Sequence, residues 1–394
     1  MDEREARLGL NCVVEPGTRE VAEAVATFGV EEVWKLLLTL DGDHPLGLRA
    51  RRFTPGPVLA AAASLGARFL IPSDPEWPAQ LADLDHCEPV NELNGTPFGL
   101  WVRGGGDLAS LARRCVAVVG SRASSSYGET VAADLAGDLA AAGCSVVSGG
   151  AFGIDAAGHR GCLAAGSPTI AVLAGGVDHA YPAAHRQLFD RIAEDGVLVS
   201  ELPPGQHPTR LRFLGRNRLI AAVSQGTVLV EAAARSGGRN TVTWANCLRR
   251  VVMAVPGPVT SALSHTPHRL IREGEAVLVT RAADVLELLG PLGRGSPRPP
   301  SEHRATDDLG RDELRVYEAI PARGSLSAGE VSLRSGVQLA LCLAILDDLA
   351  ERGLVAQSES YEWRLPPGRR RPGTSGPPRP DRDLPSATPP VPGA

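Results

Sequence analysis

Residues 116–150 read VAVVGSRASSSYGETVAADLAGDLAAAGCSVVSGG, and this stretch decides the fold. Its first four residues form a short apolar run that ends at Gly120, which predicts a buried strand. Apolar residues at helical spacing then predict a helix over 131–142 that stops at Gly143. Residues 146–147 begin a second strand-like run that enters two glycines. Strand, helix and strand at this spacing indicate a parallel βαβ unit.

The same alternation of strands and helices continues to about residue 290. Further strands are expected at 169–173, 196–200, 227–230 and 251–255, and helices at 155–165, 184–194, 218–223 and 240–248. This pattern predicts an α/β fold of the Rossmann-like, doubly wound kind, in which helices cover both faces of a mostly parallel sheet. We assign residues 71–290 to this domain.

Smaller segments are expected on either side of this domain. Residues 1–70 contain helical patterns, the longest at 21–40, which predict a small helical module of the SAM or helix-hairpin-helix kind. Residues 291–310 are rich in Pro, Gly, Arg and Ser, which predicts a flexible linker. Three helical patterns and a hairpin pattern over 311–365 predict a winged-helix module. The Pro- and Arg-rich residues 366–394 are expected to be a disordered tail.

Composition and charge narrow the function classes. The chain of 394 residues has a formal net charge of −5, which disfavours nonspecific packaging of nucleic acid but leaves room for a local basic groove. No stretch approaches the ~20 apolar residues of a membrane span, and the charged start MDERE does not resemble a secretory signal. We therefore expect a cytoplasmic protein with no membrane partner. The seven scattered cysteines form no Cys-x-x-Cys pair, so no metal site is predicted.

Four loops that follow predicted strands carry the candidate site. The first contains Gly120, Ser121 and Arg122, where glycine lets the backbone approach an anion at the start of a helix. The next glycine is Gly128, so the Gly-x-Gly-x-x-Gly fingerprint of dinucleotide sites is absent and no cofactor is predicted. The alternative is a tight strand-to-helix turn, and Arg122 favours the anion site. Because Lys35 is the only lysine, any phosphate site must use arginines and backbone N–H groups.

The second loop contains Gly149, Phe152 and Gly153 and is followed by Asp155 and His159 on one face of a predicted helix. A catalytic Asp–His pair is one interpretation of this spacing. No Ser or Cys in the sequence signals a matching nucleophile, so we favour a structural interpretation. In that interpretation, Asp155 caps the helix and the Asp–His pair is a local contact.

The third loop, RLRFLGRNR at 210–218, combines four arginines with one aromatic residue. Arginines pair with phosphates and a Phe ring offers a face on which a base can stack, although a solvated basic loop is the alternative. The fourth is a Gly-rich turn at 236–239. All four loops should open at the carboxyl ends of parallel strands, where doubly wound folds bind ligands, which predicts a polyanion groove. From the last two loops the candidate contacts are Arg210, Phe213, Arg216, Asn217, Arg218, Ser236, Gly237 and Arg239.

In this order, the motifs resemble the DprA (Smf) family of DNA-processing proteins. The resemblance is strong over about residues 70–290, and its main motifs are at 118–122, 148–160, 169–173, 181–182, 213–218, 230–237 and 256–257. It implies a protein that binds single-stranded DNA, forms a homodimer and loads a RecA-type recombinase in natural transformation or recombination. By position it implies a pocket made of Ser121, Arg122, Arg210, Phe213, Arg216, Asn217 and the turn at 236–237.

Some positions depart from the family pattern. Phe152 stands where many members carry Arg, so the second loop lacks that guanidinium as a phosphate contact, and an aromatic ring there can stack on a base instead. His185 stands where Asn follows the Tyr-Pro motif, and Thr266-Pro267-His268 replaces Gly-Thr-Asn.

The sequence gives less support to two alternative functions. A nucleotide phosphoribohydrolase of the lysine-decarboxylase-like group carries Pro-Gly-Gly-x-Gly-Thr followed by Glu, whereas here Glu231 precedes the loop at 236–241. We therefore expect no catalytic activity. A duplex-DNA regulator would use the winged helix, but the acidic residues of 311–365 suit a phosphate backbone poorly and favour a protein-interaction or autoregulatory role.

Overall fold

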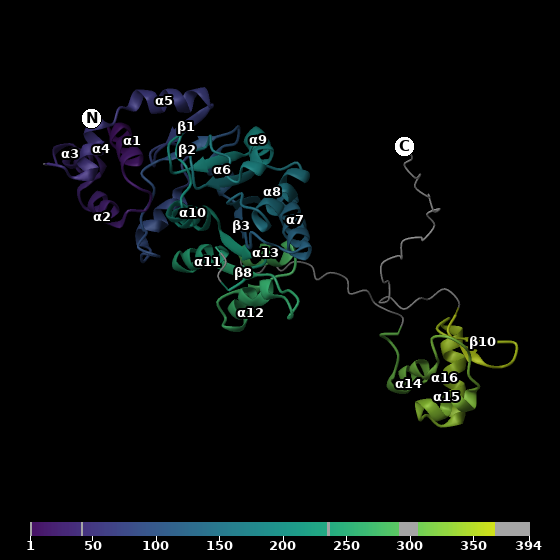
Figure 1. The fold of residues 1–394 in the computed structure, drawn as a ribbon. Coiled ribbons are helices and arrows are strands. Elements are labelled where there is room, and N and C mark those ends of the chain that lie inside the picture. Colours follow the sequence, from purple (N-terminus) through teal and green to yellow (C-terminus); the bar gives the residue numbers. More distant parts are fainter. Residues whose placement is uncertain (1, 41, 235–236, 291–305, 367–394) are drawn as a thin grey trace, which may run out of the picture. The chain divides into compact units, whose positions relative to one another are not determined.

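The computed structural model describes residues 2–40, 42–234, 237–290 and 306–366 (Figure 1). The chain divides into two compact units, whose described parts are 2–290 and 306–366. Most of the predicted linker (291–310) and of the predicted tail (366–394) lies outside the described residues.

The first unit is built around a nine-stranded sheet with the order β1-β2-β6-β5-β4-β3-β7-β8-β9. All pairs from β6 to β9 are parallel, as predicted, and β1 and β2 add an antiparallel edge. The strands are β1 Ala67–Leu70, β2 Leu100–Arg103, β3 Cys115–Val119, β4 Ser145–Ser148, β5 Thr169–Leu173, β6 Val197–Ser200, β7 Gly226–Leu229, β8 Val251–Ala254 and β9 Val277–Leu278.

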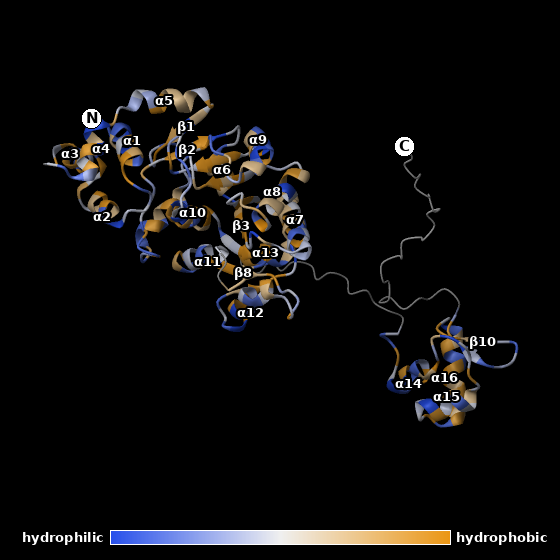
Figure 2. Ribbon diagram, viewed as in Figure 1, coloured by the Kyte–Doolittle hydropathy of each residue, from blue (hydrophilic) through white to orange (hydrophobic). Residues whose placement is uncertain are grey.

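Helices pack on both faces of this sheet because its strands are apolar on both sides. Val116 and Val118 of β3 belong to a buried cluster with α7, α8 and α13, whereas Ala117 and Val119 belong to a cluster with α10 and α11. Figure 2 shows the apolar colour concentrated in strands such as β3 and β8. The helices after β2 are α6 Leu108–Ala112, α7 Ser126–Ala141, α8 Ile154–Ala164, α9 Arg186–Asp195, α10 Arg210–Val223, α11 Gly238–Cys247, α12 His265–Arg272 and α13 Ala282–Leu289.

The order of the strands creates a switch point beside β3. From β3 the chain proceeds through β4, β5 and β6 towards one edge of the sheet, and then returns to place β7, β8 and β9 on the other side of β3. The connections on the two sides of β3 therefore leave in opposite directions. Doubly wound sheets bind ligands in the crevice that opens at the carboxyl ends of the strands at such a point.

Five helices precede the sheet in the same compact unit: α1 Glu3–Val13, α2 Arg19–Phe28, α3 Val30–Thr39, α4 Pro45–Arg52 and α5 Pro55–Ser64. The single helix predicted over 21–40 is wrong, because the chain breaks at Gly29, which has a positive φ of 82°. Buried Asn11 of α1 donates to the carbonyls of Gly99 and Glu201 and accepts from the indole of Trp101. These contacts fix α1 on the sheet.

In its described residues, 306–366, the second unit contains three helices and one small antiparallel sheet. These are α14 Arg311–Ala319, α15 Ala328–Ser335, α16 Leu339–Glu351, β10 Ala356–Gln357 and β11 Trp363–Arg364. Val316, Leu346 and Trp363 lie in its own buried core. The order of elements is the expected one, and the winged-helix assignment stays a prediction. In the described ranges no single helix meets the length and apolarity of a membrane span; α15 and α16 meet them only together, across a 107° bend.

Candidate nucleic-acid interface

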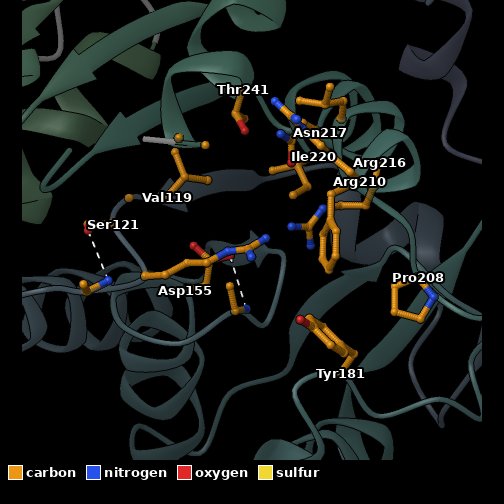
Figure 3. A pocket seen from close by; sticks show the side chains of 18 of the residues that line it. Val119, Ser121, Asp155, Tyr181, Pro208, Arg210, Arg216, Asn217, Ile220 and Thr241 are labelled. Atoms are coloured by element: carbon orange, nitrogen blue, oxygen red, sulfur yellow. Dashed lines mark hydrogen bonds between the residues drawn. The ribbon is translucent and has the colours of Figure 1, made fainter. Parts of the chain in front are cut away.

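A pocket of about 780 Å³ opens at the carboxyl ends of β3 and β7, at the switch point of the sheet (Figure 3). The loop after β3, the start of α8, one face of α10 and the start of α11 line it. Tyr181 and Pro208 lie on one side of the pocket and Thr241 on the opposite side. The predicted convergence of the loops at this edge of the sheet is therefore found, and the following residues show how it is built.

Glu231 ties the loops after β3 and β7 together. The N–H of Ser121 donates to the Glu231 carbonyl at 2.7 Å, and the Glu231 carboxylate accepts from the N–H and hydroxyl of Ser125 at 2.9 and 2.6 Å. Gly120 must be glycine, because a Cβ would lie 2.6 Å from Ile154 and 2.8 Å from the Glu231 carbonyl. The buried carboxylate sits at the N-terminus of α7, where a negative charge is stabilised.

Asp155 organises the second loop. Its carboxylate accepts from the N–H groups of Gly149 and Ala151 at 3.2 and 3.4 Å, and burial raises its pKa above the ordinary value. Gly153 has a φ of 76°, and a Cβ there would lie 2.3 Å from the Ser121 carbonyl. Asp155 therefore fixes the shape of the second loop, and Gly153 lets that loop approach the first one closely.

His159 does not join Asp155, and the predicted local contact between them is wrong. Its Nδ1 lies 2.9 Å from the hydroxyl of Thr169, and burial lowers its pKa to about 3. A histidine that stays neutral and wholly buried is a core residue. The two side chains share a helix but bond to different partners.

The segment expected to be an arginine-rich loop is the first half of α10. Its N-cap is Thr209, whose hydroxyl accepts from the N–H of Arg212. The helix therefore begins eight residues before the predicted 218. On a helix, residues three, four and seven apart share a face, so Arg210, Phe213 and Asn217 all line the pocket.

Arg216 forms the inner wall of the pocket. Its side chain is buried, and Nη1 donates to the carbonyls of Gly149 and Val172, both at 2.7 Å. Burial lowers its pKa to about 10; the Asp155 carboxylate opposes this shift and Arg122 adds to it. Gly149 makes room for the guanidinium, because a Cβ would lie 1.8 Å from Nη1. The predicted role of Gly149 in the anion site is therefore indirect.

Aromatic and cationic groups meet at the mouth of the pocket. The guanidinium carbon of Arg122 lies 4.7 Å from the centroid of the Phe213 ring, and that of Arg216 lies 5.8 Å from it. The ring of Tyr181 is 5.4 Å from the same centroid. Asn217 donates to the side-chain oxygen of Asn240 at 3.0 Å. Arg122 and Arg210 are exposed, so their charges are accessible to a ligand.

Five of the predicted contacts do not line the pocket: Gly149 and Gly153 of the second loop, and the side chains of Phe152, Arg218 and Arg239. Arg218 is 1% exposed and forms two 2.6 Å bonds with Glu201, so the expectation that it lines the groove is wrong. Phe152 is exposed but packs at 4.7 Å on the ring of His185, outside the pocket lining. Arg239 is exposed in the first turn of α11 and does not line the pocket.

The remaining lining residues include some that were predicted from the sequence and some that were not. Ser121 and Gly237 line the pocket as predicted, whereas Ser236 lies outside the described residues. Tyr181 and Thr241 line it and were not among the predicted contacts. The Tyr-Pro motif at 181–182 was a usable signal for Tyr181. Within the described ranges, no group of three or more His, Cys, Asp or Glu side chains could hold a metal ion.

The fold and the pocket define a doubly wound α/β protein with an arginine-lined ligand site at its switch point. Residues 68–290 match the family described as DNA recombination-mediator protein A. The chain belongs to this DprA/Smf family. It is 47% identical over 302 residues to the DprA-type DNA processing protein of Mycobacterium tuberculosis strain H37Rv, covering 76% of this chain and 77% of that protein.

More distant relatives carry the names DprA or Smf. The DNA processing protein DprA of Streptococcus pneumoniae is 41% identical over 209 residues, covering 52% of this chain and 71% of that protein. The protein Smf of Escherichia coli is 38% identical over 249 residues, covering 61% of this chain and 63% of that protein. The X-ray structure of the Streptococcus pneumoniae protein matches with a TM-score of 0.59 at 30% identity and covers 73% of this chain and 97% of that chain.

Proposed function

We propose that the pocket binds single-stranded DNA and that the protein delivers the strand to a RecA-type recombinase without catalysing a reaction. The observation that carries the DNA part is that the guanidinium groups of Arg122 and Arg216 lie 4.7 and 5.8 Å from the Phe213 ring in the pocket. Guanidinium groups neutralise phosphates, and an aromatic ring stacks on an unpaired base whatever its sequence. In a duplex the base faces are already stacked, so this combination favours a single strand.

The remaining parts of the proposal come from the family resemblance. They are the recombinase contact and the homodimer. The proposed cytoplasmic location rests instead on the apolar pattern of the sequence, and the division into a helical module, a central domain and a winged helix rests on its helix and strand patterns. The absence of turnover is supported by the bonds of two carboxylates near the loops, those of Glu231 and Asp155. Glu231 is bonded to Ser125 outside the pocket lining, and Asp155 already accepts two backbone N–H groups.

The test of the DNA-binding proposal compares oligonucleotides. Full-length protein is titrated against a single strand and against the matching duplex, and binding is followed by mobility shift at several salt concentrations. We expect clearly tighter binding of the single strand at every salt concentration. Equal or tighter binding of the duplex would contradict the proposal.

Two arginines on α10 provide a matched pair for the phosphate contacts. Arg210 lines the pocket, whereas Arg212 pairs at 2.7 Å with Glu15. Each phosphate contact with a single strand contributes ~0.7 to the slope of log affinity against log salt. We expect Arg210→Gln to weaken binding and reduce that slope by about 0.7. Arg212→Gln should leave the affinity and the salt slope unchanged. If the two substitutions had the same effect, the DNA groove would have been assigned to the wrong face of α10.

Phe213 should contribute by stacking. It is partly exposed at the pocket mouth, and base stacking on an aromatic side chain is worth ~1–3 kcal/mol. We expect Phe213→Ala to weaken DNA binding by about that amount with little change in salt slope, because no charge is lost. Phe213→Tyr should be nearly neutral. If thermal melting of Phe213→Ala fell far below wild type while the folded fraction bound DNA normally, the ring would be a packing residue.

A further inference from the structure

The described residues that line the pocket carry three guanidinium groups and one carboxylate. The arginines are Arg122, Arg210 and Arg216, and the carboxylate is that of Asp155. Asp155 is buried and its carboxylate already accepts two backbone N–H groups. In this part of the chain the pocket therefore has positive charge beyond what its own carboxylate neutralises.

Arg216 provides an independent sign that a ligand completes the site. Its side chain is more than nine-tenths buried, and its Nε has no hydrogen-bond partner among the described residues. A buried, charged donor without a partner is costly to the unliganded protein. An anion in the pocket would compensate this buried positive charge.

Two helix N-termini add to the positive electrostatic potential of the pocket. The first turns of α8 and α11 contribute Asp155 and Thr241 to the lining, so both helices begin at the pocket. The N-terminus of a helix carries a partial positive charge and favours anions. Together with the three arginines, this arrangement suits a group that carries more than one negative charge.

We propose that the pocket receives a terminal phosphomonoester of the DNA single strand, so that the protein recognises phosphorylated strand ends. This inference rests on the proposed function and deepens it. A phosphodiester inside a strand carries one negative charge, whereas a phosphomonoester carries about 1.5 to 2 near pH 7. The pocket volume of about 780 Å³ lies within the range of sites for a molecule the size of a nucleotide.

The experiment uses full-length protein and three oligonucleotides of one sequence, each with an internal fluorophore. One carries a 5′-phosphate, one a 3′-phosphate and one hydroxyls at both ends, and affinities are measured by anisotropy. At pH 7.5 we expect one phosphorylated form to bind roughly tenfold more tightly than the hydroxyl form, the effect of one further charge-assisted contact. Which of the two does so identifies the end that enters the pocket.

The advantage should depend on pH in a defined way. The second proton of a phosphomonoester has a pKa of about 6, so at pH 5.5 its charge approaches that of a diester and the advantage should fall to about twofold or less. Among the described residues, the titratable and charged groups that line the pocket are Arg122, Arg210, Arg216, Asp155 and Tyr181. The hydroxyl oligonucleotide measures any titration of these protein groups, since it differs only at its ends.

The outcomes separate this inference from the proposed function. Arg210→Gln should reduce the advantage of the phosphorylated end, whereas Arg212→Gln should retain it. Equal affinity for all three oligonucleotides at pH 7.5 would overturn the inference and leave single-strand binding intact. An undiminished advantage at pH 5.5 would also overturn it, because charge could not be the cause. Failure to bind any of the three would refute both.

Discussion

Arg218→Met is expected to lower the free energy of unfolding of the first unit by ~3–5 kcal/mol, the usual cost of removing one partner from a buried ion pair. The Arg218 and Glu201 side chains are 1% and 8% exposed, and both carboxylate oxygens lie 2.6 Å from the guanidinium. Arg218 also donates to the carbonyls of Gly95 and Gly215. The substitution leaves the Glu201 carboxylate buried without these donors.

The measurement is urea unfolding followed by tryptophan fluorescence in a Trp363→Phe background. Trp363 is in the core of the second unit and the other four tryptophans are in the first, so the signal then reports one unit. The control is the double variant Arg218→Met with Glu201→Leu, which removes both charges and should recover much of the loss. A loss below ~1 kcal/mol would mean that the pair is not structural, since exposed pairs contribute that little.

Arg216→Met should affect DNA binding strongly and stability only weakly, the opposite of what is expected for Arg218→Met. We expect it to weaken single-strand binding by ~2 kcal/mol or more, roughly 30-fold, because a buried charge that meets the ligand is lost. Its effect on stability should be much smaller than that of Arg218→Met. The substitution removes two hydrogen bonds and the attraction of the Asp155 carboxylate, but it also removes a positive charge that burial and Arg122 destabilise. Binding is measured by anisotropy and stability in the same Trp363→Phe background.

Two results would contradict this assignment. The first is that Arg216→Met binds single-stranded DNA with wild-type affinity, which would mean that Arg216 does not contact the strand. The second is a loss of stability as large as that caused by Arg218→Met, which would mean that Arg216 mainly stabilises the fold. Arg216→Lys is a useful intermediate, because it keeps a charge but loses the planar fork, and it should recover only part of the affinity.

The alternation of apolar strands with helices was sufficient to predict six of the seven parallel strands, and the two-residue strand β9 was missed. The strand at 169–173 was predicted with the bounds that β5 has, and β8 differs from its prediction by one residue. The antiparallel strands β1 and β2 were missed, because ARFL and LWVR are short runs whose pairing depends on contacts far apart in the chain. Gly29 divided one predicted helix into two because its positive φ interrupts the helical pattern.

By itself, the sequence determined that glycine-rich loops with arginines follow several parallel strands, and chain order then places them at one edge of the sheet. Only the tertiary structure decided what each arginine of α10 does. Successive helix residues are rotated by about 100°, so Arg210, Arg212 and Arg218 point in different directions. Arg212 forms an ion pair with Glu15 and Arg218 forms one with Glu201, whereas Arg210 lines the pocket. The physical reason is that an arginine in a helix binds whichever carbonyl or carboxylate the fold brings to its face, and residue type alone does not identify that partner.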